Sequence, residues 1–151
     1  MRVKMEFSFE YRKLGDLTYH VLTDPNEIKS YLMKWIMREW ELDHNEAPNE
    51  HWTVAWMEAL PSMEFTLEVV RLEEICPNAD LMSVEEFQKS LKERADEREE
   101  SILRGSSIEP LLVNWNGFAL MDGYTRYTVL KRFQQREVYA YVGKIQWTRL
   151  S

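Results

Sequence analysis

The sequence predicts an α+β fold in which short strands form a mixed sheet and helices pack against it. Three observations lead to this prediction. Alternating apolar and polar residues mark short strands near both ends of the chain. Two segments between them carry helix start signals. Residues 108–142, which read IEPLLVNWNGFALMDGYTRYTVLKRFQQREVYAYV, then interleave strands with an Asn-Gly hairpin turn and a short helix.

Length and composition point to one domain. A chain of 151 residues is long enough for a hydrophobic core, and 44% hydrophobic with 30% charged residues is ordinary for a globular protein. No apolar run approaches the ~20 residues that span a bilayer, and the N-terminus lacks a secretory signal. The single cysteine, Cys76, excludes an intrachain disulfide and fits a reducing compartment. We therefore expect a cytoplasmic protein without a membrane partner.

Residues 1–61 are predicted to form an extension of two strands and a helix. Val3–Phe9 alternates apolar and polar residues, and Leu17–Leu22 resembles a partner strand after a turn at residues 14–16. Residues 41–51 are expected to form an acidic loop. Residues 51–60 are ambiguous between strand and helix, and Pro61-Ser62 marks the boundary to a core of residues 62–151.

The helix of this extension has a clear start. Asp24 suits the N-cap, Pro25 suits the first helical position, and Glu27 completes a capping box. Its apolar side chains recur at helical spacing: Ile28, Leu32, Trp35, Ile36 and Trp40. A stripe of this width must be buried, so we expect the extension to be an integral layer of the domain.

The core begins with a strand and a second helix. Phe65–Val70 is the predicted strand, and Ser83 with Glu86 forms a second capping box. The inner stripe of that helix consists of Val84, Phe87, Leu91, Ala95 and Ile102. Arg98 falls on the same stripe, where it either reaches a bound phosphate or lies in solvent after a helix break near Ala95-Asp96. The second alternative is favoured. Gly105 is the expected helix stop.

The strongest functional signal is the segment Asp122-Gly123-Tyr124-Thr125-Arg126, where a predicted strand turns into a short helix. Gly123 allows close backbone approach to a ligand, and the helix N-terminus favours a bound anion. Thr125 can hydrogen-bond a phosphate oxygen or cap the helix, and Tyr124 is expected at the rim of the pocket. Arg126 offers a fork that suits phosphate or carboxylate. The structural alternative is an ordinary turn with an Asp or Thr cap and with Arg126 paired to Glu109 or another carboxylate.

This segment and the helix before it resemble the ParB/sulfiredoxin superfamily, whose members are often labelled ParB-like nuclease domains. The shared order is a strand, a proline, a charged helix, Pro-Leu-Leu-Val, a hairpin, Asp-Gly-x-x-Arg, a helix such as Tyr127–Phe133 and a strand such as Val138–Val142. The match covers about residues 65–143. It implies a ParB/sulfiredoxin-like core with a phosphate-handling pocket at the Asp-Gly-x-x-Arg turn.

The known branches of the superfamily differ at this turn. Sulfiredoxins carry Cys-His-Arg, whereas Tyr124 or Thr125 stands in place of the cysteine here. CTP-hydrolysing ParB proteins carry Gly-Glu-Arg-Arg, which this chain lacks. Free-serine kinases carry Asp-Gly-His-His-Arg, of which Asp122, Gly123 and Arg126 are present and both histidines are absent. The resemblance is therefore to uncharacterised stand-alone domains of the superfamily, and it leaves the reaction open.

From these observations we expect a nucleotide, such as ATP with Mg²⁺, or another phosphorylated small molecule to bind at Gly123–Arg126. In phosphoryl transfer or NTP hydrolysis, Asp122 would be the base or the metal ligand and Arg126 the phosphate clamp. Arg98 is a second candidate for the ligand site. The turn alone does not decide whether the protein is an enzyme.

Two other functional classes remain open. One is a nucleic-acid-associated, nuclease-like domain that uses the basic C-terminal segment, although the net charge of −7 disfavours this partner. The cations of that segment are Arg126, Lys131, Arg132, Arg136, Lys144 and Arg149. The other is a non-catalytic interaction module that holds a protein partner or a second copy through its tryptophan-rich extension.

Overall fold

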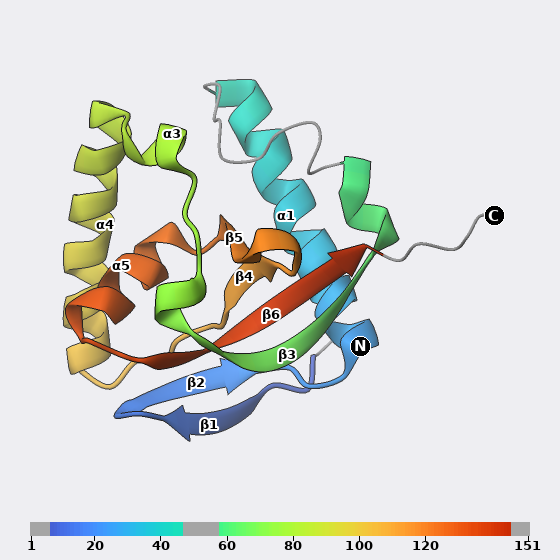
Figure 1. Ribbon diagram of the computed structural model, residues 1–151, viewed down its shortest axis with the longest axis horizontal. Coiled ribbons are helices and arrows are strands. Elements are labelled where there is room, and N and C mark those ends of the chain that lie inside the picture. Colours follow the sequence, from blue (N-terminus) through green and yellow to red (C-terminus); the bar gives the residue numbers. More distant parts are fainter. Residues whose placement is uncertain (1–6, 47–57, 146–151) are drawn as a thin grey trace, which may run out of the picture.

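The computed structural model describes residues 7–46 and 58–145 (Figure 1). In chain order its strands are β1 (Glu10–Leu14), β2 (Leu17–Val21), β3 (Met63–Arg71), β4 (Leu111–Asn114), β5 (Ala119–Asp122) and β6 (Glu137–Ile145). Its α-helices are α1 (Pro25–Glu46), α3 (Ala79–Met82), α4 (Glu85–Leu103) and α5 (Tyr124–Arg132). Short 3₁₀ turns precede β3, follow it and join β4 to β5.

The main sheet has four strands in the order β3-β6-β4-β5. β6 runs antiparallel to β3 and parallel to β4, and β5 returns antiparallel to β4 through the Asn116-Gly117 hairpin. Gly117 has φ +73°, a value at which glycine carries no steric penalty. The sheet is therefore mixed, and the predicted α+β class is confirmed.

Alternation along the strands creates three layers. On β4, Leu111 and Val113 face the cluster formed with α4 and α5, while Leu112 faces the cluster formed with α1. Figure 1 shows the same arrangement, with α4 and α5 side by side and α1 on the other side of the sheet. The corner between β5 and α5 thus lies in the layer that α4 also occupies.

The N-terminal hairpin differs from the prediction. β2 pairs with β1, Glu10–Leu14, across the turn at Gly15-Asp16, and not with the predicted strand at residues 3–9. Residues 7–9 are not in a strand, and residues 1–6 lie outside the described part of the chain. The prediction is wrong for residues 7–9, because Glu10–Leu14 pairs with β2 across the shortest available turn.

Helix α1 starts where its sequence indicates. The amide of Glu27 donates to Asp24 Oδ2 at 3.2 Å, so Asp24 is confirmed as the cap. The Glu27 carboxylate does not complete the box, because it accepts instead from the amide and hydroxyl of Ser8. The helix continues to Glu46, so the predicted loop at 41–51 is wrong for residues 41–46, and residues 47–57 lie outside the described residues.

The predicted apolar stripe of α1 is mostly buried where its side chains are described, which excludes Trp40. Ile28, Leu32 and Ile36 pack against sheet residues, which include Phe65, whereas Trp35 stays exposed. The extension therefore shares a core with the sheet in the described part of the chain. That residues 62–151 do not fold cooperatively without the extension stays a prediction.

Helix α4 starts differently from the prediction. The Ser83 hydroxyl donates to the carbonyl of Asp80, and the preceding short helix α3 is capped by Asn78, whose Oδ1 accepts from Leu81 at 3.1 Å. Val84 precedes α4 and is exposed, so it does not belong to the inner stripe. The predicted stop is confirmed, because Gly105 has φ +108°.

No helix in residues 7–46 or 58–145 is long and apolar enough to cross a membrane.

Candidate functional site

The predicted strand-to-helix corner is present. β5 ends at Asp122, Gly123 adopts φ +100° and ψ +31°, and α5 begins at Tyr124. A Cβ on Gly123 would lie 2.9 Å from both Arg126 Nη2 and Leu111 Cδ2. Glycine is therefore required here twice over, for its left-handed backbone and for the space that the Arg126 guanidinium occupies.

Arg126 folds back against this corner and is largely buried. Its Nη1 donates to the carbonyl of Pro110 at 2.7 Å and lies 3.5 Å from Glu109 Oε1. Its Nη2 lies 3.8 Å from Asp122 Oδ2, and only 12% of the side chain is exposed. The pairing with Glu109 that the sequence offered as the structural alternative is therefore observed, and part of the arginine's charge is already neutralised.

Glu109 connects this corner to the N-terminal layer. The Tyr31 hydroxyl of α1 donates to Glu109, and His20 Nε2 of β2 lies 3.7 Å away. His20 Nδ1 is in turn 2.7 Å from the Ser107 hydroxyl. Burial alone would raise the pKa of Glu109, but His20, the positive charge of Arg126 and the Tyr31 hydroxyl lower it to about 2. Since His20 is at a long hydrogen-bonding distance, we attribute more of this effect to Arg126 and Tyr31.

Tyr124 is not at the rim of a pocket, as its sequence position suggested. It is 4% exposed, its hydroxyl donates to the carbonyl of Leu120 at 3.1 Å, and the same oxygen accepts from the Asn78 amide at 3.0 Å. Its ring makes an edge contact with Phe87 of α4, with centroids 5.7 Å apart. Tyr124 thus ties α5 to α4 and to the loop before α3. Thr125 is half-buried in the first turn of α5.

Arg98 is on the exposed surface of α4, close to Arg126. The expected break near Ala95-Asp96 is wrong, because α4 is continuous from Glu85 to Leu103. Partial burial of its guanidinium and the positive charge of Arg126 both lower the pKa of Arg98, and Glu109 opposes them. The residue as a whole remains exposed, so only its charged end is partly buried. The positive charges of Arg98 on α4 and Arg126 on α5 therefore influence each other.

Asp122 is the remaining predicted site residue. Its side chain is 14% exposed at the end of β5, next to Arg126. Within residues 7–46 and 58–145, no three His, Cys, Asp or Glu side chains converge as a metal site. Mg²⁺ commonly takes only one or two carboxylates and completes its shell with phosphate and water oxygens. Asp122 therefore fits a metal that arrives with a phosphate, and does not fit a metal held by protein alone.

The described cations of the basic C-terminal segment do not form one patch, and Arg149 lies outside the described residues. Arg126 is in the buried network, and Arg132 Nη1 lies 2.9 Å from both Asp96 Oδ1 and Glu99 Oε1. Lys144 lies over the Trp115 ring at 5.5 Å. Lys131 and Arg136 instead line a polar cavity of about 860 Å³ together with Arg71, at the C-terminal end of α5. Sequence reasoning missed this cavity because Arg71 is distant in the chain.

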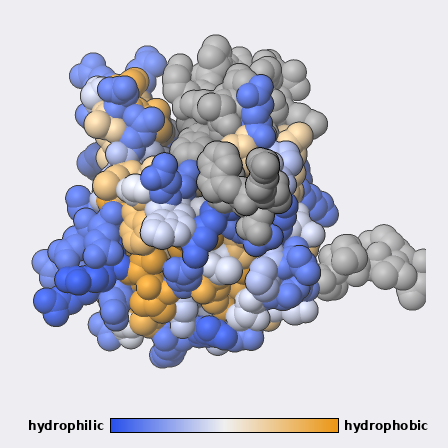
Figure 2. All heavy atoms as spheres, turned by 45° about the vertical axis from the view of Figure 1, so that its right-hand side comes forward, coloured by the Kyte–Doolittle hydropathy of each residue, from blue (hydrophilic) through white to orange (hydrophobic). Residues whose placement is uncertain are grey.

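Exposed hydrophobic side chains are scattered over several elements. Trp115 is half-exposed beside the β4–β5 hairpin, and its ring makes an edge contact with Phe118. Tyr11 of β1 and Val69 of β3 are exposed as well. On the face drawn in Figure 2, hydrophobic residues are interspersed with hydrophilic ones.

Comparison with known proteins gives structural neighbours only. No protein-family model matches the chain, and no curated protein matches it. Two similar solved structures are described as pNOB8-like ParB N-domains. The first is 24% identical with a TM-score of 0.44 and covers 57% of this chain and 32% of its own. The second is 27% identical with a TM-score of 0.41 and covers 56% of this chain and 29% of its own. The chain thus spans about a third of their length.

Proposed function

We propose that the corner Gly123–Arg126, together with Arg98, binds the phosphate of a nucleotide or of another phosphorylated small molecule. The observation that carries the proposal is the electrostatic repulsion between Arg98 on α4 and Arg126 in the first turn of α5, two helices that lie side by side (Figure 1). Like charges at short range repel, and an anion between them relieves the repulsion. The first amides of a helix have no carbonyl partner within the helix and add donors for the same anion.

The charges of the corner favour one phosphate group over a long polyanion. Arg126 is shared with Glu109 and Asp122, so much of its charge is already compensated. Arg98 is exposed, and the charge of Glu109 also acts on it. Glu109 mainly neutralises Arg126, because these two side chains are both largely buried and lie 3.5 Å apart. Arg98 therefore supplies the charge that attracts the ligand, and Arg126 supplies a fixed neighbour. With Mg²⁺ carried by the phosphates, Asp122 would contribute one carboxylate ligand.

A thermal-shift series with ATP, CTP and GTP, each with and without Mg²⁺, tests the proposal. A ligand at 100 times its Kd should stabilise the folded chain by about 2.7 kcal/mol, which is readily visible. Arg98→Ala should remove the shift without changing the unliganded Tm, because Arg98 is exposed. Arg104→Ala is the matched control at the end of the same helix, with a side chain that is 74% exposed. Equal shifts in all three proteins would refute the role of Arg98, and phosphate release in the same samples separates hydrolysis from binding.

A second candidate function is a nucleic-acid-associated or protein-interaction domain. The observation in its favour is the half-exposed Trp115 ring with Lys144 above it, which pairs a stacking surface with a cation. Binding of a single-stranded oligonucleotide that weakens steeply with salt, and that Trp115→Ala abolishes, would favour this function over the first.

A further inference from the structure

A second polar site lies at the opposite end of α5, about 13 Å along the helix from Gly123 at 1.5 Å per residue. Its cavity of about 860 Å³ falls in the size range of small-molecule pockets. Three segments that are separate in the sequence form its walls: residues 71–73 after β3, Tyr127 and Lys131 on α5, and residues 134–137 before β6. The Leu72 amide donates to the Arg136 carbonyl at 2.9 Å and joins two of these walls.

The lining combines three kinds of chemistry. Arg71, Lys131 and Arg136 supply positive charge, although the whole chain carries −7. Gln134 and Gln135 supply carboxamides, and Glu73 and Glu137 supply acceptors. Tyr127 also lines the cavity; the residue is largely buried, and Lys131 Nζ lies 5.6 Å from its ring centroid.

The cations remain available to a ligand. Arg71 is paired with Glu73 at 2.9 Å, but both side chains are mostly exposed. Exposed pairs of this kind contribute little, so an incoming phosphate can replace the carboxylate. Lys131 and Arg136 are also accessible at the surface.

The loop after α5 has an unusual backbone. Gln134 directly follows the C-cap Phe133 and has φ +55°, a position that glycine or asparagine normally occupies. The chain thus keeps a carboxamide at the cavity where glycine would be less strained, and such strain is often retained at functional sites.

We infer that this cavity binds a phosphorylated sugar or polyol. Three cations match one or two phosphate groups, whereas a nucleic-acid site commonly uses about six to ten phosphate contacts. Glu73 and Glu137 would repel an extended polyanion, but they accept hydrogen bonds from sugar hydroxyls. The two glutamines add donors for the same hydroxyls, and the Tyr127 ring packs against the carbon skeleton. The inference concerns a site separate from the Gly123–Arg126 corner.

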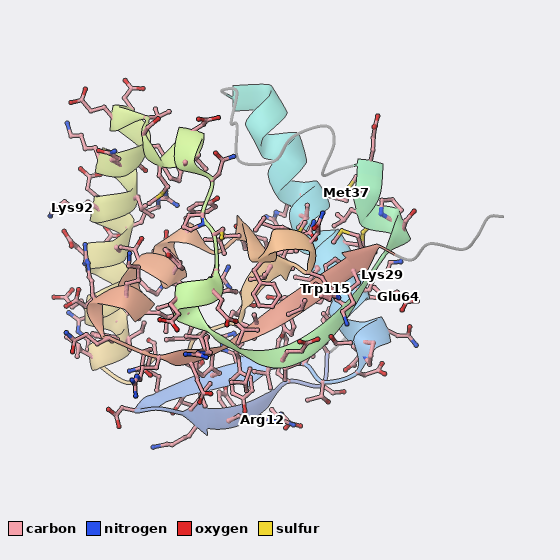
Figure 3. The ribbon with its side chains drawn as sticks, in the orientation of Figure 1. Arg12, Lys29, Met37, Glu64, Lys92 and Trp115 are labelled. Carbon is pink, nitrogen blue, oxygen red and sulfur yellow. The ribbon has the colours of Figure 1, made fainter. Side chains whose placement is uncertain are left out.

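Backbone amide NMR of the full chain with ribose 5-phosphate tests the inference, with ribose and inorganic phosphate as partial probes. The sugar phosphate should shift the amides of residues 71–73 and 134–137, and it should bind more tightly than either part. Arg136→Gln and Lys131→Gln should each weaken it about tenfold, the usual effect of losing one charged hydrogen bond. Lys92→Gln is the control, because Lys92 is 72% exposed and points away from the body of the molecule on α4 (Figure 3).

Four results would overturn the inference. The first two are no shifts at millimolar ribose 5-phosphate and shifts confined to residues 122–126. The other two are wild-type affinity in the Arg136 and Lys131 variants, and an affinity for phosphate alone that equals the affinity for the sugar phosphate. Tighter binding of a single-stranded oligonucleotide at the same residues would overturn it as well and identify a nucleic-acid surface. Shifts at residues 122–126 alone would support the corner site and reject the cavity, so the two sites are tested independently.

Discussion

The two ends of helix α5 carry cations in opposite situations. At the N-terminal end Arg126 is buried and is held by Glu109, Asp122 and a backbone carbonyl. At the C-terminal end Lys131 and Arg136 are exposed around a cavity. The buried contacts of the first end connect the N-terminal layer to the sheet through Glu109. Arg98 adds an accessible charge near this end. The second end has little structural commitment, so its cations can be used for binding.

Replacing the central arginine at each end should give the largest contrast. Arg126→Ala removes the cation beside the Glu109 carboxylate, which keeps only Tyr31 and His20, and it removes the donor to the Pro110 carbonyl. Breaking a buried ion pair costs about 3–5 kcal/mol. Arg136→Ala should change the free energy of unfolding little, because its side chain is exposed. Urea unfolding of both variants measures the difference. Equal losses would show that the two ends do not differ as described.

Two glycines with a left-handed backbone give a second contrast: Gly123 before α5 and Gly105 after α4. Gly123→Ala should cost about 3 kcal/mol, because a left-handed backbone and a Cβ 2.9 Å from Arg126 Nη2 both oppose it. Gly105 has a similar φ of +108°, but a Cβ there would meet no atom within 4 Å, so Gly105→Ala should show the backbone cost alone. If the two variants unfold at the same urea concentration, the Arg126 guanidinium does not occupy the space over Gly123.

Acid should weaken the buried end through Glu109. The folded chain lowers the pKa of this carboxyl from 4.5 to about 2, so the unfolded chain binds more protons between these values. Its stabilisation is therefore complete above the unfolded pKa and is lost as the pH falls toward 2, on the order of 3 kcal/mol. Glu109→Gln should unfold with a flatter pH dependence over this window. A slope identical to that of the wild type would remove Glu109 from the network.

The smallest expected effect concerns the buried tyrosine of the same corner. Tyr124→Phe removes the hydroxyl that bonds Leu120 and Asn78, which should cost about 1 kcal/mol. Tyr11→Phe, at a residue that is 73% exposed, should leave the unfolding midpoint unchanged. An unchanged unfolding midpoint in Tyr124→Phe would contradict this, and would show that the hydroxyl is hydrated and not buried in its bonds to Leu120 and Asn78.

Features set by a few adjacent residues could be predicted from the sequence. The Asp24-Pro25 helix start, the Gly105 stop and the Gly123 corner depend on local backbone geometry, and the structure confirms them. The predicted Ser83 cap is wrong although its pattern is local, because the chain makes a separate short helix that ends at that serine. The local pattern does not reveal that Ser83 ends the preceding helix α3, where its hydroxyl donates to the Asp80 carbonyl.

Features that depend on distant residues could not be predicted. Tyr124 is expected to be accessible because it follows the turn glycine, but Phe87 and Asn78 enclose it from another part of the chain. The cavity beside Lys131 needs Arg71, which only the pairing of β3 with β6 brings close. The pairing of Arg126 with Glu109 could be named as an alternative, but its burial could not.

The most direct test of the central claim is a titration of the full chain with ATP and Mg²⁺, followed through backbone amides and arginine side-chain signals. Phosphate binding between Arg98 and Arg126 predicts shifts at residues 122–126 and at the Arg98 side chain, and predicts their loss in Arg98→Ala but not in Arg104→Ala. Shifts confined to residues 134–137, or none at millimolar nucleotide, would contradict it and leave the Gly123–Arg126 corner with a structural role alone.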